Sequence, residues 1–269
     1  MPAKYTNEIL ETAYDLIVNK GYSANKASKE LGIDNGTMRK RLKERYGQIF
    51  LPDGKKQIDS TFFSKIDTEE KAYWLGFLTA DGYVKDNIIE LALAEIDKKH
   101  VENFKTSIKS QHALSKKTSK INDKTFYSYR ISIRDKQMAN DLRSYGLTNN
   151  KSYDAYIPSE IQIPNNLFRH YIRGMFDGDG SIYNGANGIN ISIITASEQM
   201  HKDFYYAVKK HINIEMLARI TRNLFELRLF SKKDVYRFLS WIYDDSTIYL
   251  ERKYNKFKNA DLGQKSQKS

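Results

Sequence analysis

The stretch FDGDGSI, residues 176–182, places two carboxylates two positions apart among glycines, directly after a segment rich in apolar residues. The preceding residues 166–175 carry their apolar side chains at helical spacing, so we expect a helix that ends at Asp179, with Gly180 as its left-handed stop. The C-terminal end of a helix is the negative end of its dipole, where a carboxylate is disfavoured by roughly 0.3–1 kcal/mol. We therefore expect a cation near Asp179.

The same stretch occurs earlier in the chain in a related form. Residues 73–84, YWLGFLTADGYV, align with residues 171–182, YIRGMFDGDGSI, at an offset of 98. In each copy strand-like alternations, a helix, two further strands and a last helix follow the motif, and we read the order of both halves as α-β-β-α-β-β-α. The sequence therefore predicts an α/β (α+β) fold of two pseudo-symmetric halves that pack through their motif helices.

Small residues recur one helical turn apart in both motif helices, at Gly76, Ala80, Gly174 and Gly178. Residues without a bulky side chain let two helix backbones approach closely. If the two helices pack on each other, their C-terminal ends bring Asp81 and Asp179 side by side. Two ionised carboxylates at that distance repel unless a divalent cation lies between them. The pattern predicts a metal bound by Asp81 and Asp179.

Both stretches resemble the LAGLIDADG signature of homing endonucleases, in the form that carries two copies in one chain, over roughly residues 62–258. The resemblance implies that Asp81 and Asp179 are catalytic and bind Mg²⁺, for which Mn²⁺ would substitute. It also implies a basic catalytic residue in each half, at Lys151 and Lys253, to offset charge that develops on the phosphates.

A further polar position of the family lies just after the second strand of each half. Asp97 and Ser197 occupy it here, and the resemblance implies that they position water. Asp177 falls on the family's other acidic position, where the first copy has Thr79, so we assign Asp177 no part in catalysis.

Basic residues dominate the chain, which has 269 residues, 44 Lys and Arg, 33 Asp and Glu, and a formal net charge of +11. They concentrate in residues 35–47, 98–136 and 209–237, between Tyr, Ser, Thr and Asn, which favours nucleic acid as a partner. The chain has no cysteine, which excludes disulfides, thiolate nucleophiles and cysteine-based zinc sites. No apolar run is long enough to span a membrane, and no basic amphipathic helix indicates membrane binding.

Alternating polar and apolar residues in the predicted strands indicate sheets with one buried face and one polar face. An antiparallel ribbon with such a face fits the major groove, where arginine pairs with guanine and asparagine with adenine. An ordinary solvated face remains the alternative for any single residue. The candidates for DNA contact are Ser128, Arg130, Ser132, Arg134, Asn190, Ser192, Arg219, Arg222 and Arg228.

Residues 1–47 precede the repeat and read as three short helices with a small apolar core. The turn at residues 31–34 and the basic residues after it resemble a helix-turn-helix, a DNA-binding unit whose last helix enters the major groove. We expect a linker at 48–61, halves at 62–158 and 159–258, and a disordered tail at 259–269. The candidates for DNA contact in this unit are Arg39, Lys40, Arg41 and Lys43.

The resemblance implies a site-specific homing endonuclease that cuts both strands of double-stranded DNA and leaves short 3′ overhangs. We expect a monomer with no small-molecule substrate and no membrane partner, located in the cytoplasm or an organellar matrix with access to DNA. The alternative is a LAGLIDADG-derived RNA maturase, or a DNA-binding regulator without cleavage activity. The presence of both acids and both lysines favours the enzyme.

Overall fold

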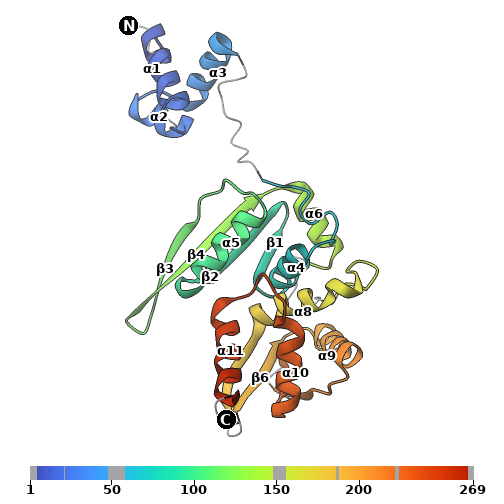
Figure 1. Ribbon diagram of the computed structural model, residues 1–269. Helices are drawn as coiled ribbons and strands as arrows, with labels where there is room; N and C mark the ends of the chain where they lie inside the picture. Colours follow the sequence, from blue (N-terminus) through green and yellow to red (C-terminus); the bar gives the residue numbers. More distant parts are fainter. Residues whose placement is uncertain are drawn as a thin grey trace. The chain divides into compact units, whose positions relative to one another are not determined.

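The computed structural model describes residues 5–20, 22–47, 58–147, 156–185, 188–221 and 224–265, with the backbone alone at residues 121 and 261–265. The chain divides into two compact units, residues 1–56 and 57–269 (Figure 1). The predicted linker at 48–61 is too long at its C-terminal end, because the Asp59 amide already bonds the Ile108 carbonyl and Ser60 bonds Asp135 in the larger unit.

The N-terminal unit consists of three helices around a small apolar core. Thr6, Ser23 and Asp34 each accept a hydrogen bond from a first-turn amide, which is how such residues start helices. The core includes Ala27, Ile33, Met38 and Leu42, while Leu31 is partly buried. The helices are α1 (Asn7–Val18), α2 (Ala24–Glu30) and α3 (Asn35–Tyr46).

The larger unit contains the two predicted halves in the predicted order, and its mixed α/β fold class is confirmed (Figure 1). The first half comprises α4 (Glu69–Asp81), β1 (Gly82–Lys85), β2 (Ile88–Ala94), the short 3₁₀ turn η2 (Glu95–Asp97), α5 (Lys98–Ser107), β3 (Ser115–Ile121), β4 (Lys124–Arg134) and α6 (Lys136–Ser144). The second half comprises α8 (Asn165–Asp179), β5 (Gly180–Gly185), β6 (Gly188–Thr195), α9 (Glu198–Ile212), β7 (Leu217–Thr221), β8 (Leu224–Leu229), α10 (Lys232–Tyr243) and α11 (Glu251–Lys265).

Each half folds its strands into one antiparallel sheet, and the two sheets have the same topology. The strand order is β1-β2-β4-β3 in the first and β5-β6-β8-β7 in the second. One face of each sheet is buried against helices, as Ile131 and Ile133 show in β4 and Leu227 and Leu229 in β8. The opposite faces carry the polar residues of the alternation, as predicted.

Helix α11 is the main departure from the predicted organisation. The sequence predicts a disordered tail at residues 259–269, but residues 259–265 lie in this helix, which also carries Lys253. Buried Phe257 and half-buried Tyr254 attach the helix to the core, and the chain continues helically beyond that anchor. The expected disordered tail is therefore wrong for residues 259–265.

The two motif helices end where the sequence predicted, at Asp81 and Asp179, but by a different mechanism at the second. Gly180 has φ −76° and ψ 158°, an extended conformation that opens β5, so the predicted left-handed stop is wrong. Glycine is needed for space instead, since a Cβ at Gly180 would lie 2.3 Å from Phe176 Cδ2. None of the helices in the described part of the chain is long and apolar enough to cross a membrane.

Candidate functional site at the paired helix ends

The motif helices α4 and α8 pack with their backbones in direct contact. A Cβ at Gly76 would lie 2.0 Å from the Tyr171 carbonyl oxygen, and a Cβ at Gly174 would lie 2.0 Å from the Tyr73 carbonyl oxygen. No side chain larger than hydrogen fits at either position. The contacts are reciprocal, which is the pattern expected when two equivalent helices cross about a pseudo-twofold axis.

This crossing places the two motif carboxylates together at the C-terminal ends of the helices. Asp81 is the last residue of α4 and Asp179 the last residue of α8, and both are exposed. A Cβ at Gly178 would lie 2.3 Å from the Ala80 Cβ and 3.4 Å from the Asp81 Oδ2, so the Asp81 carboxylate lies against the end of α8. All four small residues of the motif thus lie at or near this crossing.

Lys253 supplies a cation at the end of α8. Its Nζ donates hydrogen bonds to the carbonyl oxygens of Phe176 (2.7 Å), Asp177 (2.6 Å) and Gly178 (3.2 Å). Lysine has three donors, and all three are used on carbonyls in the last turn of α8. This arrangement counters the negative end of the helix dipole.

Burial sets the charge state of Lys253. The side chain is only 3% exposed, and burial lowers its pKa to about 8, against the opposing attraction of Asp177 and, more weakly, of Asp81 and Asp179. Lys253 therefore remains mostly protonated at neutral pH. Its ammonium group interacts with both motif carboxylates, so it belongs to the same site.

The donor set at the helix ends fits a hard divalent cation. Asp81 and Asp179 offer carboxylate oxygens, and Mg²⁺ typically takes one or two carboxylates and completes its octahedron with water and substrate phosphate. No group of three or more His, Cys, Asp or Glu side chains with metal-binding geometry occurs among the described residues. The two aspartates therefore suit a site that the phosphate of a substrate completes.

Asp177, to which the sequence analysis assigned no part in catalysis, has a structural role at this site. It is fully buried, and it accepts hydrogen bonds from the Tyr73 hydroxyl (2.8 Å), the Tyr243 hydroxyl (2.5 Å) and the Leu250 amide (2.7 Å). Burial raises its pKa, while the charge of Lys253 and these hydrogen bonds oppose the rise. Asp177 therefore fixes the segment that leads into α11, and with it the position of Lys253.

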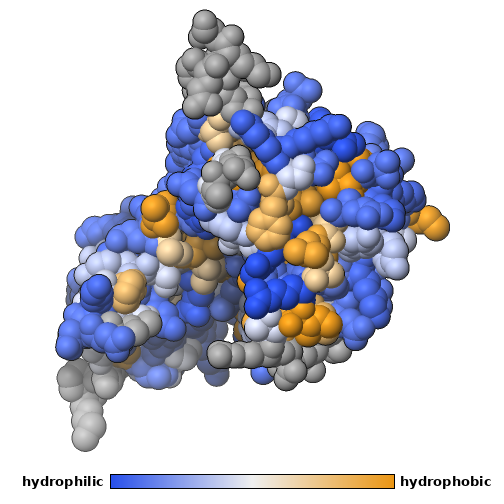
Figure 2. Space-filling view, turned by 90° about the horizontal axis from the view of Figure 1, so that it is seen from below, coloured by the Kyte–Doolittle hydropathy of each residue, from blue (hydrophilic) through white to orange (hydrophobic). Residues whose placement is uncertain are grey.

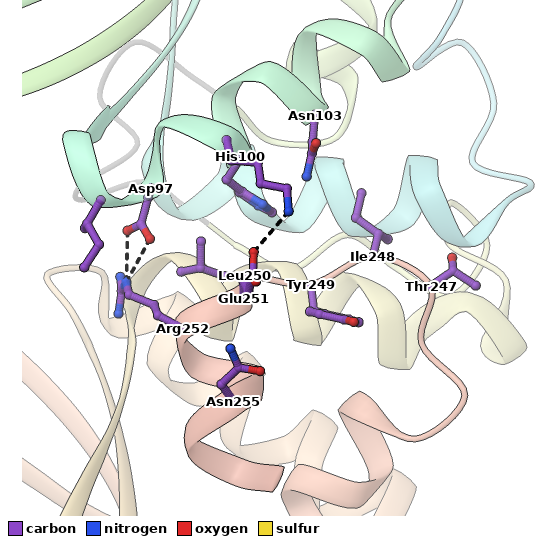
Figure 3. Close-up of a pocket in the computed structure, with 12 residues that line it drawn as sticks. Asp97, His100, Asn103, Thr247, Ile248, Tyr249, Leu250, Glu251, Arg252 and Asn255 are labelled. Atoms are coloured by element: carbon purple, nitrogen blue, oxygen red, sulfur yellow. Dashed lines mark hydrogen bonds and ion pairs between the residues drawn. The ribbon is translucent and has the colours of Figure 1, made fainter. Parts of the chain in front are cut away.

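Asp97, which the family resemblance suggested would position water, forms an ion pair with Arg252. It is largely buried, and the Arg252 Nε donates to both of its carboxylate oxygens, at 3.1 and 2.9 Å. Figure 3 shows this pair at one end of a cavity of about 490 Å³ between α5 and residues 247–255. Lys99 and Glu251 make a second ion pair across it, at 3.3 Å. These contacts hold the start of α11 against the first half.

Ser197 is also engaged in a local contact. It is buried, and its hydroxyl accepts a hydrogen bond from the Met200 amide at 3.1 Å, so it caps the N-terminus of α9. The same capping preference of serine is visible in the sequence, where Ser197 directly precedes Glu198 and a helical pattern.

Most of the predicted DNA-contact residues that the structure describes are accessible at the surface, but Ser192 is not. Ser192 is 6% exposed and flanked by strands on both sides, so its side chain is not available at the surface. Arg222 and the predicted catalytic Lys151 lie outside the described residues. The remaining candidates are exposed or half-buried on the open sheet faces and on α3: Ser128, Arg130, Ser132, Arg134, Asn190, Arg219 and Arg228, and Arg39, Lys40, Arg41 and Lys43.

Comparison with known proteins places the geometry in a family context. Residues 167–243 match the LAGLIDADG-like domain family. No curated protein matches the chain. The homing endonuclease I-WcaI bound to its DNA recognition sequence is similar in structure, with a TM-score of 0.56 and 12% identity over 72% of this chain and 87% of that chain.

Two other solved structures are similar over comparable lengths. The LAGLIDADG meganuclease I-AabMI bound to uncleaved DNA gives a TM-score of 0.49 and 16% identity, over 74% of this chain and 92% of that chain. The N-terminal LAGLIDADG domain of DUF199/WhiA gives 0.47 and 17%, over 69% and 89%. At these identities the likeness concerns the fold, which has the same two-half architecture as in the I-WcaI structure.

Proposed function

Because this chain belongs to the LAGLIDADG family, we propose that it is a site-specific endonuclease that hydrolyses both strands of a long double-stranded DNA target with a divalent metal. The observation that carries the proposal is the meeting of Asp81 and Asp179 at the exposed ends of two helices whose backbones touch. The fold alone does not require acids there, since each lies at the unfavourable end of a helix dipole.

Asp81 and Asp179 would hold the metal, which we propose to be Mg²⁺ with Mn²⁺ as a substitute. The chemistry that such a metal supplies when bound is the activation of water and the stabilisation of the leaving 3′ oxygen. Lys253 would keep the end of α8 neutralised, so that Asp179 can remain ionised without repulsion from the adjacent carbonyls. Asp97 would act by holding Arg252, the neighbour of Lys253, rather than by positioning water.

DNA is the partner that the charge and the open sheet faces support. Arg130, Arg134 and Arg219 are exposed on faces that a duplex can approach, and the formal net charge of +11 favours a polyanion. The I-WcaI structure, which has the same fold, is bound to its DNA recognition sequence. We propose that the chain acts as a monomer, that α3 of the N-terminal unit adds contacts, and that cleavage leaves short 3′ overhangs.

A binding protein without cleavage activity, acting on RNA splicing or on transcription, is the second candidate. One observation favours it: the Lys253 ammonium is buried and bonded to three carbonyl oxygens. In this arrangement the lysine stabilises the helix end whether or not a phosphate is ever cut. Metal-dependent cleavage therefore separates the two candidates.

The experiment uses the full chain and a target duplex, enriched by binding in EDTA from randomised duplexes and from DNA spanning the uninterrupted allele of its own locus. With Mg²⁺ the chain should cut both strands, and with EDTA it should bind without cutting. The double variant Asp81→Asn/Asp179→Asn should bind the target but not cut it. Asp245→Asn is the matched control, because Asp245 is exposed with φ 58°, which asparagine tolerates. Specific binding without cleavage at any Mg²⁺ or Mn²⁺ concentration would favour the binding protein.

A further inference from the structure

The two open sheet faces can be compared position by position, because the strand registers match. Arg130 in β4 and Arg228 in β8 lie at equivalent positions, 98 residues apart. On the outer strand, Arg130 faces Ser115 in β3, and Arg228 faces Leu217 in β7. The small polar residue of the first half is thus replaced by a large aliphatic residue in the second. Leu217 is 59% exposed.

A second pair differs in the same direction on the inner strand. Ser128 in β4 faces Ala94 in β2, whereas the equivalent Glu226 in β8 faces Ile194 in β6. Ile194 is 43% exposed, and its neighbour Ile193 is buried, so Ile194 is on the open face. Leu217 and Ile194 therefore lie on opposite sides of β8, both exposed on the face that lacks a helical cover.

The charges of the two open faces differ as well. The alternation places five basic residues on the first face and two on the second among the described residues: Lys85, Lys117, Lys124, Arg130 and Arg134, against Arg219 and Arg228. Arg228 is also bound to Glu226 at 2.7 Å, while Arg130 and Glu90 are 3.5 Å apart. Figure 2 shows small groups of apolar residues within a mainly hydrophilic surface on one side of the molecule.

Exposed aliphatic side chains on a nucleic-acid-binding face have a specific counterpart in DNA. In the major groove, thymine is the base that presents a methyl group, and apolar side chains recognise it by contact. A face with few cations and with exposed aliphatic side chains, Leu217, Ile194 and Leu224, suits such contacts better than it suits hydrogen bonds to guanine. The first face, with small neighbours around Arg130, suits guanine.

On the basis of the proposed function, we propose that Leu217 and Ile194 read thymine methyl groups in the half-site bound by the second half. The half-site bound by the first half would be read through its basic residues instead. The target is then asymmetric in chemistry as well as in sequence, with methyl-dependent recognition confined to one side of the cleavage site.

Two features place DNA, rather than a protein, against this surface. Strand β5 begins at Gly180, directly after Asp179, so the open face of the second sheet starts at the proposed cleavage site. The aliphatic residues also share this face with Arg219, Arg228 and Asn190, whose side chains can bind phosphates and the edges of guanine and adenine. If this face binds a protein instead, substitutions of its aliphatic residues should leave DNA binding unchanged.

The test replaces thymine by deoxyuridine, which removes the 5-methyl group and nothing else. The full chain is titrated in EDTA against its enriched target with the substitution made in one half-site, in the other, or in both. We expect about fourfold weaker binding for each recognised methyl group that is removed, the value of one buried methyl-sized group. The weakening should occur in one half-site only.

Exchange of residues between the halves identifies which sheet is responsible. The variant Leu217→Ser/Ile194→Ala carries the residues of the first half and should lose the sensitivity to deoxyuridine. The reciprocal variant Ser115→Leu/Ala94→Ile should gain sensitivity in the other half-site. All four side chains are exposed, so thermal unfolding should be unchanged in both variants.

The outcomes separate this inference from the proposed function. If no duplex is enriched by binding, both fail. If the chain binds and cuts its target but both half-sites respond equally to deoxyuridine, or neither responds, the methyl readout is wrong and the endonuclease proposal stands. The inference also fails if the sensitivity persists unchanged in Leu217→Ser/Ile194→Ala.

Discussion

Tyr73 on α4 and Tyr171 on α8 occupy equivalent positions, and each reaches across the helix crossing to the other helix, but their partners differ. The Tyr73 hydroxyl donates to a carboxylate, Asp177 Oδ2, at 2.8 Å. The Tyr171 hydroxyl donates to another hydroxyl, Thr79 Oγ1, at 3.3 Å. One of these two tyrosine contacts therefore contains a buried carboxylate, and the other contains two hydroxyl groups.

The contact at Asp177 extends beyond the two motif helices. The Thr79 hydroxyl donates a hydrogen bond to the Leu75 carbonyl of its own helix at 2.8 Å. Asp177 also binds Tyr243 of α10 and the Leu250 amide before α11. The comparison shows how a pseudo-symmetric pair of halves becomes asymmetric: one buried carboxylate fixes an additional helix, and that helix carries Lys253 to the shared site.

The largest effect should come from the acids that the two halves share. Asp81→Asn and Asp179→Asn each remove one charge from a joint site, so each should slow cleavage of both strands by about 10³-fold or more. Binding in EDTA should be retained or tightened, because a negative charge near the phosphates is removed. The measurement follows both end-labelled strands of the target in single-turnover kinetics.

An effect on only one DNA strand in each variant would contradict a shared site. If Asp81→Asn impaired one strand and Asp179→Asn the other, each acid would serve its own half, and a joint site would be wrong.

The contacts of Tyr73 with Asp177 and of Tyr171 with Thr79 should also differ in how much they contribute to the free energy of unfolding. Asp177→Asn places an amide NH₂ among three donors and leaves the Lys253 charge without its buried counterpart, so we expect a loss of about 3 kcal/mol in unfolding free energy. Thr79→Val removes the acceptor of one hydroxyl and should cost about 1 kcal/mol. Urea unfolding at pH 7, followed by circular dichroism, measures both. Equal losses would mean that the charge at Asp177 has no special role.

The role of Lys253 can be tested by comparing the cleavage rates of the two DNA strands. Lys253→Met removes the ammonium donor from three carbonyls of α8 and the cation beside Asp179, so we expect roughly 10²-fold slower cleavage, with one strand slowed more than the other. Nicked DNA should accumulate. The control is Lys256→Met in the same helix, where an exposed lysine donates only to the Ile182 carbonyl at 3.0 Å. Nicking by the Lys256 variant to the same extent would remove Lys253 from the site.

The smallest difference between the two halves concerns how acid affects stability through their buried histidines. Burial lowers the pKa of His100 from 6.5 to about 3, so between these values the unfolded chain binds the proton and the folded chain does not. Stability must then fall as the pH drops below 6.5, by about 2 kcal/mol at pH 5 for this group. His100→Gln should remove that part of the acid sensitivity.

His170 in the second half is the matched comparison. Burial lowers its pKa to about 4, with the nearby Arg173 acting in the same direction and the Glu69 carboxylate opposing it. Both folded-state pKa values lie below pH 5, so His170→Gln should remove about the same part of the acid sensitivity between pH 7 and pH 5 as His100→Gln. Urea unfolding at pH 7 and pH 5 measures both, and an acid loss in His100→Gln as large as in the unmodified chain would contradict the assignment.

Much of the fold could be predicted because its signals are local. Helical and alternating periodicities placed the elements of both halves, and the repeat at an offset of 98 related them. The small residues at Gly76 and Gly174 predicted the close crossing, because only glycine leaves room for two backbones to touch. The position of Asp81 and Asp179 at the helix ends followed from the same pattern.

The sequence by itself therefore determined the two halves, the crossing of their helices and the acids at its end, since each depends on neighbours along the chain. Only the tertiary structure decided how the charges are satisfied. Asp177 finds its donors 66, 73 and 104 residues away, and the carbonyls that Lys253 caps lie 75 to 77 residues before it. A buried charge requires partners wherever the fold can supply them, and such long-range satisfaction leaves no periodic trace in the sequence.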